Sequence, residues 1–216
     1  MNSIGSFLAI VFSVILPGVG NSLVTETREK NYRDFKKFVF LNNWIVGWCA
    51  VCFICLYQPF MKLWTGEELM FPMYVVLELG LYFYIYQIRK IPVVYKDAAG
   101  IWWEDRFRPF VMAATNLISN LIMVQFIGIW GIILSTILSL LVSVPWETYT
   151  VCKHVFKGGY REYMLDLLRY LLTAALAFAG ATFGIRLLRQ FAENDGYGVL
   201  GFYCFGLSLF TFILNL

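Results

Sequence analysis

Charged residues are scarce in this chain, and their scarcity narrows its class. They make up 14% of the 216 residues, against about 25% in an ordinary soluble domain. Hydrophobic residues make up 60%, which excludes a disordered chain and argues against a soluble enzyme. The net charge of +3 is too small to indicate nucleic-acid binding. The composition therefore predicts a polytopic membrane protein.

Motifs for catalysis and metal binding are also missing from the sequence. The chain has a single histidine, His154, and contains neither H-E-x-x-H nor G-x-x-x-x-G-K-[ST]. Cys49, Cys52 and Cys55 have a metal-like spacing, but they lie in an apolar run where thiols act as small hydrophobic groups. We therefore expect no enzymatic activity, no cofactor and no metal site.

Long apolar runs are what the sequence has in abundance. Crossing the hydrocarbon layer takes about 20 helical residues, and in lipid a helix satisfies its own backbone. The sequence therefore predicts an all-α polytopic membrane bundle of about seven transmembrane helices. The predicted spans are Ile4–Val24, Phe38–Phe60, Met70–Ile88, Pro109–Ile127, Gly131–Cys152, Leu167–Leu188 and Gly198–Leu216.

The segments between these runs differ in basic residues, and the difference predicts an orientation. Fourteen lysines and arginines fall on one side, within residues 28–37, 89–108 and 153–169, and three fall on the other. Basic segments stay in the cytoplasm. We therefore expect the N-terminus outside and the C-terminus inside.

Glu78 is an ionisable residue near the centre of the third predicted span. A charge at that depth costs at least about 2.5 kcal/mol, so such residues mostly face a cavity or a partner. Tyr74, Tyr82 and Tyr86 share its helix face at a spacing of four residues. The stripe is interpreted as a cavity wall that binds a proton or cation; the alternative is a glutamate satisfied by a neighbouring helix.

Two other groups of polar residues have two possible interpretations each. Asn116 and Asn120 share a face of the fourth predicted span, where they either line a hydrophilic lumen or hydrogen-bond between helices. The loop YKDAAGIWWEDRFRP, residues 95–109, carries Arg106 and Arg108. It serves either as an interfacial anchor or as a cytoplasmic gate that contacts an anionic phosphate.

That loop, FIGIWGIILSTI at 126–137, VPWETYTVCKHVFK at 144–157 and PGVGNS at 17–22 together resemble segments of bacterial polysaccharide flippases. These flippases, of O-antigen, capsule or teichoic type, belong to the multidrug/oligosaccharidyl-lipid/polysaccharide exporter superfamily. The resemblance implies most of the C-terminal bundle of an exporter with twelve to fourteen helices. Residues 1–157 would then form five helices of that bundle, and residues 158–216 an amphipathic segment and two additional helices.

The resemblance also implies a function. The chain would flip polyprenyl-pyrophosphate-linked oligosaccharide across the bacterial plasma membrane by alternating access, together with an N-terminal half that this sequence lacks. Membrane lipids would surround it, and Na⁺ or H⁺ would be the coupling ion. The alternatives are a multidrug exporter of the same superfamily, a seven-helix receptor-like membrane protein, and a polytopic glycosyltransferase.

Overall fold

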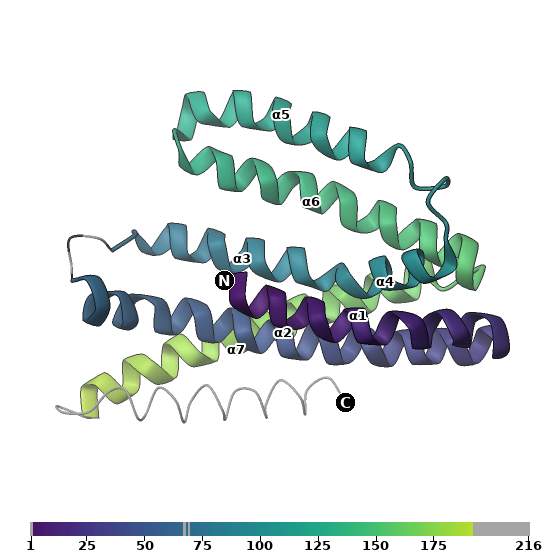
Figure 1. Ribbon diagram of the computed structural model, residues 1–216. Helices are drawn as coiled ribbons and strands as arrows, with labels where there is room; N and C mark the ends of the chain where they lie inside the picture. The colour runs from purple at the N-terminus through teal and green to yellow at the C-terminus, as the bar shows by residue number, and fades with distance from the viewer. Residues whose placement is uncertain (1, 67, 69, 192–216) are drawn as a thin grey trace. The chain divides into compact units, whose positions relative to one another are not determined.

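The computed structural model describes residues 2–66, 68 and 70–191, and all regular secondary structure among them is helical. No strand occurs among these residues, so the predicted all-α class is confirmed for them. The helices are drawn in Figure 1. In chain order they are α1 (Asn2–Thr25), α2 (Arg28–Thr65), α3 (Met73–Ile88), α4 (Lys90–Ala99), α5 (Arg108–Ile127), α6 (Trp130–Val151), the π-helical turn η2 (Cys152–Phe156) and α7 (Tyr160–Phe191).

Four helical segments in the described part are long and apolar enough to cross a membrane. They are Arg28–Trp64, Arg108–Ile127, Trp130–Phe156 and Tyr160–Phe183. The helix α5 leaves large apolar side chains exposed, for example Phe110 at 74% and Phe126 at 83%. A surface of this kind needs lipid or another protein against it.

The predicted count of seven spans is not reproduced within the described residues. The helix α3 has 16 residues, which rise about 24 Å, less than the hydrocarbon thickness of about 30 Å. The last predicted span, Gly198–Leu216, lies outside the described residues.

The helix α4 occupies part of the segment that was expected to be a loop. Its buried residues Ile91, Val94 and Tyr95 recur at helical spacing, so a short amphipathic helix forms despite the charges between them. Gly100, with φ +66°, ends the helix in a left-handed conformation that suits glycine. The connection to α5 is therefore shorter than the sequence indicated.

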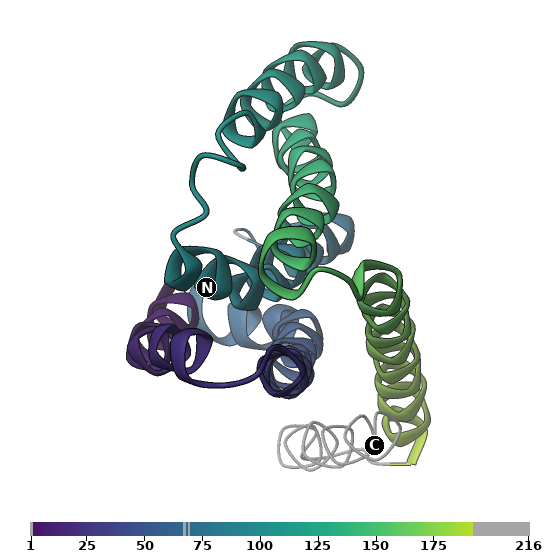
Figure 2. The same cartoon turned by 90° about the vertical axis from the view of Figure 1, so that its right-hand side faces the viewer.

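The structure divides into two compact units, and the first comprises the residues up to Asn42 and Tyr82–Met164. In this unit α5 and α6 form an antiparallel hairpin, and α4 contacts both α1 and α6 (Figures 1 and 2). Its core is aromatic: the ring of Phe35, which is fully buried, lies 4.9–5.3 Å from those of Tyr95, Phe156 and Tyr163.

The second compact unit comprises Asn43–Leu81 and the chain from Leu165 onward. The end of α2 runs beside the start of α3, where the Gln58 amide donates a 2.7 Å hydrogen bond to the Phe71 carbonyl oxygen. Gly80 allows the close approach of these helices, because a Cβ atom there would lie 2.5 Å from Ile54 Cγ1.

Candidate functional site

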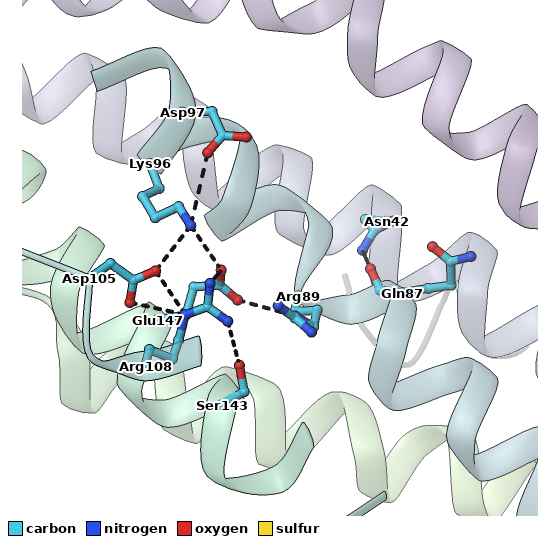
Figure 3. A network of polar contacts seen from close by, with 9 residues as sticks. All are labelled: Asn42, Gln87, Arg89, Lys96, Asp97, Asp105, Arg108, Ser143 and Glu147. Atoms are coloured by element: carbon cyan, nitrogen blue, oxygen red, sulfur yellow. Dashed lines mark hydrogen bonds and ion pairs between the residues drawn. The ribbon is translucent and has the colours of Figure 1, made fainter. Parts of the chain in front are cut away.

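A cluster of buried charged side chains is the most unusual feature of the first unit (Figure 3). Its members come from the α3–α4 junction, α4, the α4–α5 loop, the start of α5 and the second half of α6. We call it the charge network; it consists of Arg89, Lys96, Asp105, Arg108 and Glu147, with Ser143 as a neutral member.

Glu147 lies at the centre of the charge network and is fully buried. Its Oε2 accepts a hydrogen bond from Arg89 Nε at 3.2 Å. Its Oε1 lies 3.6 Å from Lys96 Nζ and 3.5 Å from Arg108 Nη2. A single carboxylate therefore faces three cations from three different parts of the chain.

Asp105 supplies the second buried carboxylate of the network. Arg108 Nε donates to both of its oxygens, at 3.0 and 2.8 Å, and Lys96 Nζ donates to Oδ2 at 3.0 Å. Arg108 Nη1 also donates to Ser143 Oγ at 2.9 Å, which links the start of α5 to α6. The network thus joins α4, α5 and α6 by charge-assisted hydrogen bonds.

A third carboxylate, that of Asp97, lies at the edge of the network. Its Oδ1 is 4.0 Å from Lys96 Nζ, and 28% of its side chain is exposed. Burial raises the pKa of the Asp97 carboxyl above its ordinary value, while nearby Lys96 and Arg108 lower it. Because burial outweighs these cations, the site favours the protonated form of Asp97 more than water does.

Local sequence explains how the loop side of the network forms. Gly100 ends α4, and the turns that follow bring Asp105 within reach of both Lys96 and Arg108. Trp102 covers the lysine from outside, with its ring centroid 5.1 Å from Lys96 Nζ. Pro109 in the first turn of α5 suits a helix start because it needs no backbone donor there.

The α6 side of the network continues a buried polar stripe. Ser135, Ser139, Ser143 and Glu147 follow one another every four residues, and each is at most 3% exposed. Ser135 and Ser139 donate to backbone carbonyls of their own helix, whereas Ser143 accepts from Arg108. Small side chains along such a stripe permit close helix packing.

The network can bind an anion or hold helices together. Taking an ion out of water costs several kcal/mol, which a buried pair recovers only with good geometry and further hydrogen bonds. Among the described residues, no group of three or more His, Cys, Asp or Glu residues is arranged to hold a metal ion. Arginine and lysine donors of this kind also suit a multiply charged anion, and in this structure they are paired with Asp105 and Glu147.

The structure separates the two arginines that the sequence grouped together. Arg108 is a buried member of the charge network, with 10% of its side chain exposed. Arg106 is exposed and stacks on Trp103 and Phe107, with its Cζ 4.2 and 4.6 Å from their ring centroids. The role of both residues at a gate or phosphate site stays a prediction.

The asparagines on α5 are in part engaged between helices. Asn116 Nδ2 donates to Thr136 Oγ1 on α6 at 3.3 Å, as the interhelical reading expects. The Oδ1 atom of Asn120 is buried and has no hydrogen-bond partner within the described part of the chain. Their predicted contact with a hydrophilic lumen is untested.

The polar stripe of the third predicted span lies on α3, as the spacing indicated. Tyr74 is 49% exposed, and Tyr82 stacks on Tyr86 with ring centroids 5.8 Å apart. Glu78 is half-buried, and its Oε2 is buried without a hydrogen-bond partner among the residues described. Glu78 and the α5 asparagines belong to different compact units, so their shared cavity stays a prediction.

Sequence reasoning missed Glu147, which the structure places at the centre of the site. The signal was present, because Glu147 lies inside the predicted span Gly131–Cys152, four residues after Ser143. The argument that singled out Glu78 applies equally to it. Arg89, Lys96 and Asp105 were treated as charges of a loop, although three-dimensional folding buries two of them almost completely.

Comparison of the chain with protein-family models, with curated proteins and with solved structures found no match.

Proposed function

We propose that this chain is part of a membrane transporter that flips polyprenyl-pyrophosphate-linked oligosaccharide across the bacterial plasma membrane. Three features support the proposal: four helices suited to a membrane, the charge network at the start of α5, and the resemblance of four sequence segments to polysaccharide flippases. The charge network is the observation that carries it, because a transporter of an anionic lipid needs buried cations at the substrate path.

Pyrophosphate is the part of this substrate that the network suits. Arginine presents a planar fork of donors that matches phosphate oxygens, and lysine adds a compact charge. In our proposal the pyrophosphate replaces Asp105 and Glu147 as the partner of Arg108 and Lys96. Between transport cycles the two carboxylates hold the cations in place and balance two of their three positive charges.

The remaining polar residues have roles in the same proposal. Sugars and pyrophosphate cannot cross hydrocarbon unaided, so a wet cavity must shield them during alternating access. Glu78, whose buried Oε2 has no hydrogen-bond partner among the described residues, binds the coupling H⁺ or Na⁺. Tyr74 and Tyr82 line the cavity beside it, and Asn116 and Asn120 contact sugar hydroxyls.

The membrane placement follows the distribution of basic residues. We propose a multi-pass protein whose N-terminus is outside and whose C-terminus is cytoplasmic, so that the charge network opens toward the cytoplasmic leaflet, where the substrate is made. An N-terminal half from the same or another chain completes the transporter. Labelling of Lys37 or Lys153 from the cell exterior would contradict this orientation.

The test is made in the bacterium that carries the gene. Deleting the gene is expected to trap lipid-linked oligosaccharide in the inner leaflet, measured by its protection from an impermeant sugar-oxidising reagent, and to remove the polymer from the cell surface. Normal surface polymer with lost export of organic cations would instead favour the multidrug exporter, and normal polymer with normal drug export would contradict both.

A pair of arginine variants then tests the site itself. Arg108→Gln is expected to lower flipping at least tenfold, because it removes the forked donor from the network. Arg169→Gln is the matched control, since this exposed arginine pairs with Asp166 outside the network, and it should flip normally. Equal transport by both variants, at equal protein levels, would remove the network from the substrate path.

A further inference from the structure

An open pocket of about 540 Å³ lies beside the end of α6, apart from the charge network. Glu104, Lys153 and His154 contribute its charged and titratable groups, and Val142 and Pro145 contribute an apolar part. None of these residues belongs to the charge network.

Besides Thr150, the rest of the pocket wall is aromatic, and part of it is held in place by contacts between its own side chains. Trp146, Tyr149 and Tyr160 line it. The rings of Tyr149 and Tyr160 meet edge to face with centroids 5.6 Å apart, and Lys153 Nζ lies 5.5 Å from the Tyr149 centroid. These contacts orient two aromatic rings and one cation before any ligand binds.

A change of helix type places the basic residues at the pocket. The turn η2, Cys152–Phe156, is π-helical, and it ends at Lys157, whose φ of 59° is left-handed. Single π-turns of this kind are frequent at functional sites. The turn presents Lys153 and His154 to the exterior, while Cys152 and Phe156 stay buried.

The polarity of the pocket changes along the helix. Lys153 and His154 stand near the end of the membrane-suited segment Trp130–Phe156, where a span meets water. Val142 lies eleven residues earlier on the chain, about 16 Å deeper along the helix axis. Tryptophan and tyrosine are the residues typical of the interface between these levels. A polar end, an aromatic middle and an apolar end match the profile of one phospholipid molecule.

We infer that this pocket binds an anionic bilayer phospholipid. Its phosphate is bound by Lys153 and His154, and its first acyl carbons lie on Pro145 and Val142. The pocket contains one acidic residue, Glu104, whereas Lys157 and Arg161 follow nearby in the chain and are exposed. Such basic clusters beside a span favour anionic over zwitterionic headgroups. The inference needs only the membrane setting and is independent of the proposed transport activity.

Native mass spectrometry of the purified full chain tests this inference. Phosphatidylglycerol and phosphatidylcholine with identical acyl chains are titrated separately. We expect one phosphatidylglycerol to be retained preferentially, and Lys153→Gln to weaken its retention about fivefold, as expected for one basic residue at a membrane surface. Lys37→Gln is the control, because this exposed lysine pairs with Asp34 and lies outside the pocket.

Each other outcome has a defined meaning. Equal retention by the wild type and Lys153→Gln would overturn the site, and equal retention of the two lipids would overturn its anionic selectivity. Polyprenyl pyrophosphate that displaces phosphatidylglycerol at equal concentration would overturn the assignment to a bilayer lipid. Melting temperatures of the variants identify any loss that comes from unfolding. A chain that fails to flip oligosaccharide should still retain phosphatidylglycerol.

Discussion

Glu147 and Glu78 are both glutamates in apolar helices, and the protein accommodates them in opposite ways. Glu147 is surrounded by three cations within 3.2–3.6 Å of its oxygens. Each glutamate has one buried oxygen without a hydrogen-bond partner among the described residues, Glu78 Oε2 and Glu147 Oε1, but the Glu147 oxygen lies within 3.6 Å of two cations. The first arrangement pairs a carboxylate with cations and joins helices, whereas in our proposal the second serves the coupling proton or cation.

The largest effect should come from Glu147→Gln. The variant leaves Lys96 and Arg108 with Asp105 and removes the carboxylate that Arg89 contacts. Loss of one member of a buried ion pair costs about 3–5 kcal/mol. We expect a clearly lower melting temperature in detergent, measured by intrinsic fluorescence. Glu78→Gln is the control for removing a glutamate charge from an apolar helix. Equal melting temperatures of the two variants would contradict the proposed difference between Glu147 and Glu78.

The second prediction concerns transport rather than stability. Glu78→Gln should keep the melting temperature and abolish the dependence of flipping on Na⁺ or H⁺, because the neutral amide cannot exchange a proton or neutralise a cation. Glu78→Asp retains the carboxylate and should retain the ion dependence. Ion-dependent flipping by the glutamine variant, measured in the same vesicles, would contradict the coupling role.

A smaller effect is expected at the α5–α6 hairpin. Asn116→Ala removes the hydrogen bond to Thr136, and such interhelical bonds contribute about 0.6 kcal/mol on average. Unfolding in mixed detergent should therefore show a loss well below that of Glu147→Gln. Thr136→Val should produce a similar loss, and the double variant should lose no more than either one if the bond is the cause.

The smallest effect concerns Asp97 and depends on pH. Burial raises the pKa of its carboxyl above the value in the unfolded chain, so folding favours the protonated form. This contribution is present at acidic pH and is lost as the pH rises through the raised pKa. Asp97→Asn should therefore be more stable than the wild type at neutral pH and equal to it at acidic pH, by melting temperature. A melting-temperature difference between Asp97→Asn and the wild type that grows toward acidic pH would contradict this prediction.

The sequence predicted some helices of this protein and missed others. The hairpin of α5 and α6 was predicted to within a few residues, because long apolar runs separated by Gly128 leave few alternatives. The helix α4 was missed, since Lys90, Lys96 and Asp97 suggest a loop when their burial is unknown. Arg108 was selected for its charge, but its partner on α6 could not be inferred from local spacing.

Apolar run length and backbone hydrogen bonding determined, from the sequence alone, that this chain is helical and suited to a membrane. Tertiary structure alone decided which of its charges are buried together. Asp105 and Glu147 are 42 positions apart in the chain, and they share Lys96 and Arg108 because α4, α5 and α6 converge there. Coulomb attraction acts over ångströms of space, and distance along the chain does not reveal it.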